Sequence, residues 1–171
     1  MELNTLLIIA TCVYACVLIA VIRVVRAGRR QTVAALAGGV AASVMAAAIE
    51  GMAHSQGLWH YRENDTPFGP VITHPLNAIV FAIVALIGWR IGRRFGMRGE
   101  AIWVSTVAII NPPGDYFAAA HWLGIIKIDR SMLPGLILMD IAAWGILSAV
   151  ALAVMNRVAE RPRRQHRHDA S

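Results

Sequence analysis

Five long runs of apolar residues, separated by short polar segments, dominate the chain. Each run is close to the ~20 residues that a helix needs to cross the hydrocarbon core of a bilayer. A segment inside lipid must pair its own backbone groups, which an α-helix does and an isolated strand does not. The pattern therefore predicts an all-α integral membrane protein, a bundle of five transmembrane helices over residues 3–25, 32–54, 73–91, 101–123 and 133–156.

Composition agrees with a membrane protein and excludes several other classes. The 171 residues are 57% hydrophobic and only 15% charged, whereas soluble domains average about 45–50% apolar and about 25% charged. This balance excludes a disordered chain, a small disulfide-bonded scaffold and an ordinary soluble enzyme. The two cysteines, Cys12 and Cys16, lie four residues apart in the first run. A disulfide between them would strain an intact helix, so we interpret them as small packing residues.

The basic residues are distributed very unevenly between the apolar runs. Thirteen of the 16 Lys and Arg residues follow the first, third and fifth runs, and only Arg62, Lys127 and Arg130 follow the second and fourth. The positive-inside rule then predicts an N-terminus outside and a C-terminus inside. We expect one transmembrane domain over residues 1–160 and a basic cytoplasmic tail over residues 161–171. The basic clusters have no interleaved aromatic residues and no groove-reading motif, which argues against a nucleic-acid partner.

The second and third runs match the fourth and fifth at a fixed offset. A shift of 67 residues places His54 on His121 and Pro67 on Pro134. One interpretation is a parallel repeat of a two-helix unit, which would place a binding site at the interface of the repeats. The other interpretation is a chance match between apolar sequences.

Three acidic residues lie inside the apolar runs or near their ends. A charged side chain at the centre of a membrane helix costs roughly 2.5–3.5 kcal/mol on insertion scales, so such residues usually mark a functional site. With the predicted orientation, Glu50, Asp115 and Asp140 all fall in the outer half of the bilayer. We expect one polar pocket facing the outer surface; the alternative is that the acids pair with each other or reach water. The other polar residues at similar depth are His54, His74, Asn77 and His121.

A proline-rich segment interrupts the fourth run. Residues 111–116 read NPPGDY, and two successive prolines remove two backbone donors and clash with the preceding turn. We expect the helix to kink or break near the middle of the membrane, directly before Asp115. Broken helices at membrane depth are tolerated where they line a cavity, and a kink used only for packing is the alternative.

Tryptophans lie one or two helical turns from two of the acids. Trp144 follows Asp140 by four residues, and Trp122 follows Asp115 by seven. An acid beside aromatic faces suits chemistry in which the acid protonates an alkene and the π faces stabilise a carbocation. Ordinary helix packing explains the same spacing. The sequence contains no His-Glu-x-x-His metal helix and no phosphate-binding loop, so we expect neither a metal nor a cofactor.

Residues 50–77 resemble a segment of the small integral-membrane enzymes of isoprenoid metabolism. The shared elements are Glu50 late in one helix, the loop GLWHY, the pair Gly69-Pro70 and the helix start HPLNA. The families are the bacterial membrane lycopene cyclases, the carotenoid hydratases and the membrane-bound terpene and meroterpenoid cyclases. The resemblance implies that membrane-embedded acids protonate an alkene or epoxide and collect a proton afterwards. Glu50 and Asp115 are then the first candidates, and Asp140 is the third.

The chain departs from those families in two respects. The lycopene cyclases carry a Pro-x-Glu-Glu-type element, where this chain has Asn77 in HPLNA. Five spans are also fewer than the six or seven usual in those families. These departures point to a different substrate or to assembly as a homo- or hetero-oligomer.

Together these patterns predict a multi-pass enzyme of a cell membrane, of the bacterial inner-membrane type. It would be a lyase or isomerase that converts an isoprenoid or terpenoid lipid by proton-initiated cyclisation or hydration, with Glu50, Asp115 and Asp140 as catalytic residues. Two alternatives stay open: a small transporter or ion-coupled carrier that uses the same acids, and a structural subunit of a membrane complex. The residues expected to line the substrate are His54, Trp59, His74, Asn77, Tyr116, His121, Trp122 and Trp144.

Overall fold

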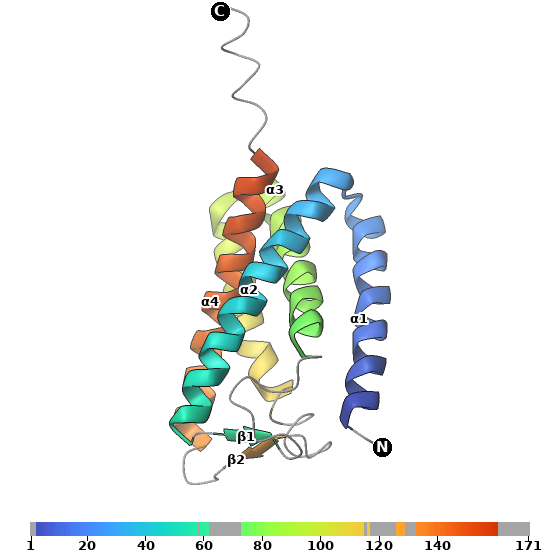
Figure 1. Cartoon of the computed structure of the whole chain (residues 1–171). Helices are drawn as coiled ribbons and strands as arrows, with labels where there is room; N and C mark the ends of the chain where they lie inside the picture. Colours follow the sequence, from blue (N-terminus) through green and yellow to red (C-terminus); the bar gives the residue numbers. More distant parts are fainter. Residues whose placement is uncertain are drawn as a thin grey trace, which may run out of the picture.

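The computed structural model describes residues 3–57, 59–61, 73–114, 116, 126–128 and 133–160. Two three-residue strands, β1 (Trp59–Tyr61) and β2 (Ile126–Ile128), form an antiparallel pair with His60 opposite Lys127. The helices form a bundle, and the strand pair lies at one end of it (Figure 1). The four helices are α1 (Leu3–Val25), α2 (Arg29–Ser55), α3 (Thr73–Gly114) and α4 (Leu133–Glu160).

In the described part of the chain, four helices are long and apolar enough to cross a membrane. This confirms the all-α prediction and agrees with a multi-pass membrane protein. The prediction of five separate helices is corrected at one place, because the third and fourth predicted helices both begin within α3. Inside α3, Gly96 leaves the helical conformation with φ 66° and ψ −162°. The helix α3 therefore consists of two helical segments, 73–95 and 97–114, that meet at one residue.

The two segments of α3 fold back on each other as an antiparallel hairpin. The indole Nε1 of Trp103 donates a hydrogen bond to the carbonyl oxygen of Val84 at 2.9 Å. A Cβ on Gly88 would lie only 2.7 Å from Cδ1 of the same indole. Glycine at position 88 thus leaves the space that Trp103 occupies, and the indole ties the second segment to the first. The hairpin is the green to yellow stretch of the ribbon in Figure 1.

The helix α2 packs closely on both α3 and α4 because its buried residues are small. A Cβ on Gly38 would collide with the carbonyl oxygen of Ala151 in α4, and one on Gly39 with that of Ala78 in α3. Small residues let helix backbones approach closely. In lipid the hydrophobic effect does not hold helices together, so they associate through close van der Waals packing of this kind. The buried residues of α2 are Ala34, Ala35, Gly38, Gly39, Ala42, Ser43, Ala46 and Ala53.

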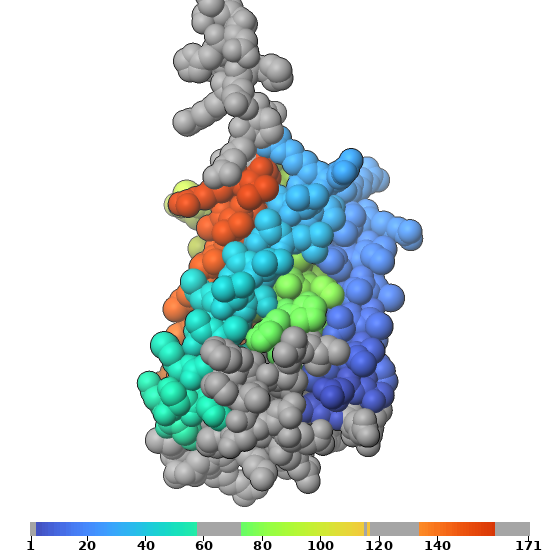
Figure 2. All heavy atoms as spheres, viewed as in Figure 1, coloured from blue at the N-terminus to red at the C-terminus, as the bar shows by residue number. Residues whose placement is uncertain are grey.

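The helix α1 lies at the edge of the bundle and packs mainly on α3. On the face shown in Figure 2, α3 comes to the surface between α1 and α2. Large apolar side chains of α1 are exposed, among them Ile8, Val13 and Val24. A soluble protein rarely exposes a contiguous face of this kind, whereas lipid covers it readily. The helix ends in a Schellman-type turn, in which Arg26 adopts φ 54° and the amide of Ala27 donates to a carbonyl one turn back.

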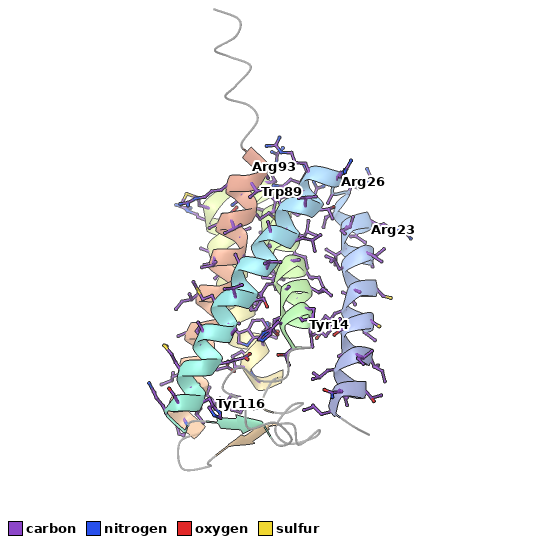
Figure 3. All side chains as sticks on the ribbon, viewed as in Figure 1. Tyr14, Arg23, Arg26, Trp89, Arg93 and Tyr116 are labelled. Carbon is purple, nitrogen blue, oxygen red and sulfur yellow. The ribbon has the colours of Figure 1, made fainter. Side chains whose placement is uncertain are left out.

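The two ends of the bundle differ in chemistry. We call the end that carries β1 and β2 the strand end, and α1 begins there (Figure 1). We call the opposite end, where α1 ends, α2 begins, α3 turns and α4 ends, the arginine end. Figure 3 shows Arg23, Arg26 and Arg93 there. All the arginines of the described segments at this end are exposed: Arg23, Arg26, Arg29, Arg30, Arg90, Arg93, Arg94, Arg98 and Arg157.

Candidate functional site

The last two turns of α2 carry an acid and a histidine. Glu50 and His54 are one helical turn apart, so they share a face of the helix. Both residues are half-buried. The Oε2 atom of Glu50 and the Nδ1 atom of His54 are shielded from solvent. A carboxyl group and an imidazole therefore lie inside the protein, at the strand end of an otherwise apolar helix.

The first two turns of α3 add a second histidine and an amide. His74 and Asn77 are three residues apart, and both are half-buried. The hydroxyl of Ser43 in α2 donates a hydrogen bond to the carbonyl oxygen of His74 at 2.8 Å, which fixes the start of α3 against α2. The Nδ1 atom of His74 is shielded from solvent and has no hydrogen-bond partner among the described residues. Buried polar atoms of this kind call for a partner, so the His74 imidazole is the clearest sign of a ligand site.

The first three turns of α4 contribute an acid and an aromatic ring. Asp140 and Trp144 are one turn apart and half-buried. The Trp144 indole packs on the Phe81 ring of α3, with 5.1 Å between ring centroids and 41° between the ring planes. Tilted pairs at this distance are favourable aromatic contacts. The pair forms an apolar wall between α3 and α4. Phe81 lies two turns after His74, and Trp144 lies one turn after Asp140.

Three of these side chains, Glu50, Asn77 and Asp140, lie at a similar depth in the bundle. At 1.5 Å per residue, Glu50, Asn77 and Asp140 are about 6–11 Å from the strand-end termini of their helices. The helices α2, α3 and α4 pack against one another in all three pairs. Three elements thus bring polar groups to one end of one packed unit. We call this set the polar cluster: Glu50, His54, His74, Asn77, Asp140 and Trp144.

The described part of the proline-rich segment, residues 111–114, lies towards the strand end of the hairpin, and its depth in the membrane stays a prediction. Gly114 follows Gly96 by 18 residues, which in an antiparallel hairpin puts it near the level of Ala78, 18 residues before the turn. The α-helix runs through both prolines to Gly114, and Tyr116 lies in a π-helical turn. Prolines cannot donate to the carbonyl four residues back, which favours a wider turn at this point.

The structure locates some of the remaining candidates and leaves others outside its described residues. Tyr116 is half-buried, and Figure 3 shows it at the strand end of the bundle. Trp59 is described as part of β1, without its side chain. Asp115, His121 and Trp122 lie outside the described residues. The predicted polar site is therefore represented by the polar cluster and Tyr116.

Sequence reasoning missed two residues that support the polar cluster. Ser43 lies one turn after Gly39 on the small-residue face of α2 and holds the His74 carbonyl. Phe81 lies two turns after His74, a spacing that puts both on one face of α3 and could have indicated its role. Within the described residues, no group of three or more His, Cys, Asp or Glu side chains is placed to hold a metal ion.

Comparisons of the chain with protein-family models, with curated proteins and with solved structures found no match. Function is therefore inferred from the chemistry of the polar cluster and from its place in the bundle.

Proposed function

We propose that this chain is a multi-pass membrane enzyme that transfers protons to and from an isoprenoid or terpenoid lipid. The observation that carries the proposal is the shielding of Glu50 Oε2, His54 Nδ1 and His74 Nδ1 at one end of three packed apolar helices. Ionisable groups at such positions are rare in membrane helices and usually serve a substrate, an ion or a proton. An acid can protonate an alkene, an imidazole can take a proton back, and aromatic faces can stabilise the cation between these steps.

The proposed reaction conserves electrons and therefore needs no redox cofactor. The Glu50 carboxyl gives its proton to one carbon of a C=C bond, whose π electrons form the new C–H bond and leave a carbocation. A second C=C bond attacks the cation and closes a ring, and a neighbouring C–H then loses its proton to the His74 imidazole or the Asp115 carboxylate. In hydration, water attacks the cation and the same base takes the extra proton. The rings of Trp144 and Phe81 would stabilise the cation through their π faces.

The proposal includes five membrane crossings, with the N-terminus outside and the polar cluster in the outer half of the bilayer. The second segment of α3 has 18 residues, or about 27 Å of helix, which is close to the thickness of the hydrocarbon core. The exposed arginines at one end of the bundle support this orientation, since basic ends face the cytoplasm.

The resemblance of residues 50–77 to membrane isoprenoid cyclases and hydratases supports the same class of reaction. Glu50, at the start of that segment, and His74, near its end, lie on two neighbouring helices at the strand end of the bundle. The segment therefore contains both an acid and a candidate base. A reaction that adds one proton to the substrate and removes another needs both groups.

The test compares lipids from cells that supply diverse prenyl precursors and express the wild type, Glu50→Gln or Glu100→Gln. Glu50→Gln keeps the size of the side chain but has no carboxyl proton to give. Glu100→Gln makes the same chemical change at the arginine end, where the side chain bonds Asn156 Nδ2 at 3.3 Å. We expect mass spectrometry to find an isoprenoid product with the wild type and Glu100→Gln, and none with Glu50→Gln.

Two results would contradict the proposal. One is full product formation by Glu50→Gln at the expression level of the wild type. The other is an identical lipid profile with and without the wild-type protein. In the second case, proton-coupled flux in liposomes would indicate a carrier, and a stable co-purifying protein would indicate a subunit of a complex.

A further inference from the structure

The turn of the α3 hairpin concentrates positive charge at the tip of the arginine end. Arg90, Arg93, Arg94 and Arg98 lie within nine residues around Gly96, and all four side chains are exposed. Because both helical segments continue almost to Gly96, the four guanidinium groups are carried on helices rather than on a long loop. Their placement is thus set by the hairpin itself.

Two of these arginines stack on aromatic rings of the same hairpin. The Cζ atom of Arg93 lies 5.9 Å from the centroid of the Trp89 ring, and that of Arg94 lies 5.2 Å from the centroid of the Phe95 ring. A guanidinium over a ring face keeps its N–H edges available for other acceptors. Such an edge matches two oxygens of a phosphate in bidentate geometry.

Apolar side chains are exposed between the arginines. Phe95 is 62% exposed and Met97 is 86% exposed, on either side of Gly96. Exposure of large apolar side chains to water is unfavourable, because water cannot hydrogen-bond to them. At a membrane surface they can enter the boundary between headgroups and acyl chains while the arginines stay at the phosphates.

Acidic groups do little to offset this charge. Glu100 is half-buried, its carboxylate accepts a hydrogen bond from Asn156, and it lies against Gly92. Glu160, the last residue of α4, is the other acid of the described segments at this end. Further exposed arginines at the same end, on α1, α2 and α4, add to the positive excess.

We propose that the tip of the α3 hairpin is a binding site for the phosphate headgroup of an anionic phospholipid. Arg93 and Arg94, oriented by Trp89 and Phe95, would contact the phosphate oxygens, and Phe95 with Met97 would contact the first carbons of the acyl chains. Charge complementarity selects an anionic lipid, and the exposed apolar pair selects a lipid over a free phosphate. The site is separate from the polar cluster, so this proposal does not depend on the enzymatic one.

The test measures lipid binding to the full chain purified in a neutral detergent. Phosphatidylglycerol, phosphatidylcholine and inorganic phosphate are each titrated, with native mass spectrometry and thermal unfolding as readouts. The variant Arg93→Gln/Arg94→Gln is compared with Arg23→Gln/Arg29→Gln, which removes the same charge from α1 and α2 at the same end. We expect bound phosphatidylglycerol and a raised melting temperature for the wild type, and neither effect with phosphatidylcholine or phosphate.

The matched variants separate a defined site from general charge. Removing two arginines from the tip should weaken phosphatidylglycerol binding about 30-fold, as expected for the loss of two direct charge-assisted contacts to the phosphate. The control pair should change it by less than about threefold, since it lies outside the tip. Equal losses in the two variants would show that only net charge matters and would overturn the site. Binding of inorganic phosphate as strong as that of the lipid, or equal binding of phosphatidylcholine, would overturn it as well.

Discussion

Gly38 and Gly39 are neighbours in sequence but serve two different helix interfaces. Successive residues of a helix point about 100° apart, so Gly38 meets the backbone of α4 and Gly39 meets the backbone of α3. The absence of a Cβ at both positions lets α2 pack closely on α3 and on α4. The high alanine and glycine content of this run marks it as a packing helix in the sequence. Which glycine faces which neighbour could be known only from the fold.

The first prediction concerns this close approach. Gly38→Ala should destabilise the protein by about 1–3 kcal/mol, because the new methyl group would collide with the backbone carbonyl of Ala151 and force the helices apart. Gly135→Ala is the control, since nothing lies within 4 Å of the Cβ position there. Thermal unfolding in detergent measures both. A melting temperature of Gly38→Ala equal to that of the control would show that the interface between α2 and α4 is wrong.

The residues of the polar cluster were largely visible in the sequence. Four of them are ionisable side chains in apolar runs: Glu50, His54, His74 and Asp140. Placing such groups in a membrane is costly in free energy, so they stand out in the sequence. The supporting contacts of Ser43 and Phe81 were not visible, because a serine and a phenylalanine are ordinary residues of membrane helices. Their roles depend on which faces of α2, α3 and α4 meet.

The hydropathy pattern predicted the positions of the helices correctly except at the α3 hairpin, where two predicted helices are joined. The predicted runs at 3–25 and 133–156 begin at the same residues as α1 and α4. Between 91 and 101 the sequence is rich in arginine and glycine, which predicted a loop. Arginine and methionine are good helix formers, so the helices continue, and Gly96 alone makes the turn. The pairing of β1 with β2 was missed because strands of three residues carry no periodic signal.

The second prediction tests that turn. Gly96 combines φ 66° with ψ −162°, a region that only glycine occupies readily, so Gly96→Ala should cost about 1–3 kcal/mol. Gly114→Ala should have little effect, since a Cβ at Gly114 meets nothing within 4 Å. Chemical or thermal unfolding of the two variants in the same detergent gives the comparison. Equal stability would mean that position 96 does not adopt this conformation.

The third prediction tests how the α3 hairpin is held together. Trp103→Phe removes the hydrogen bond to the carbonyl of Val84 and should lower stability by about 1 kcal/mol. Trp89→Phe is a control from the same hairpin, since it keeps an aromatic ring beneath Arg93. Melting temperatures of the pair provide the measurement, and an unchanged Trp103→Phe would show that the indole does not join the two segments.

The two ends of the bundle hold different kinds of residues. The strand end holds the polar cluster within three packed helices, and the arginine end holds the exposed basic residues. The distribution of arginine in the sequence predicted which elements share an end, and the structure groups those elements in the same way. What the sequence could not supply is the contact between helices distant along the chain, which fixes the site.

The fourth prediction concerns orientation in the membrane. Cysteines are introduced at Lys127 in β2 or at Met97, which is 86% exposed at the arginine end, in a chain with Cys12 and Cys16 replaced by alanine. A membrane-impermeant maleimide added to intact cells should label Lys127→Cys at once. It should label Met97→Cys only after the membrane is opened. The reverse pattern would invert the orientation and place the polar cluster in the inner half.

Deuterium transfer from solvent to lipid tests the proposed proton transfer by Glu50 itself. Membranes with the wild type or Glu50→Gln are incubated with prenyl lipids in D₂O, and the products are analysed by mass spectrometry. Protonation of an alkene by an exchanged carboxyl group predicts one carbon-bound deuterium in the product of the wild type, for cyclisation and for hydration alike. Glu50→Gln should give none. Absence of carbon-bound deuterium with the wild type, or equal incorporation with Glu50→Gln, would contradict the proposed proton-transfer function.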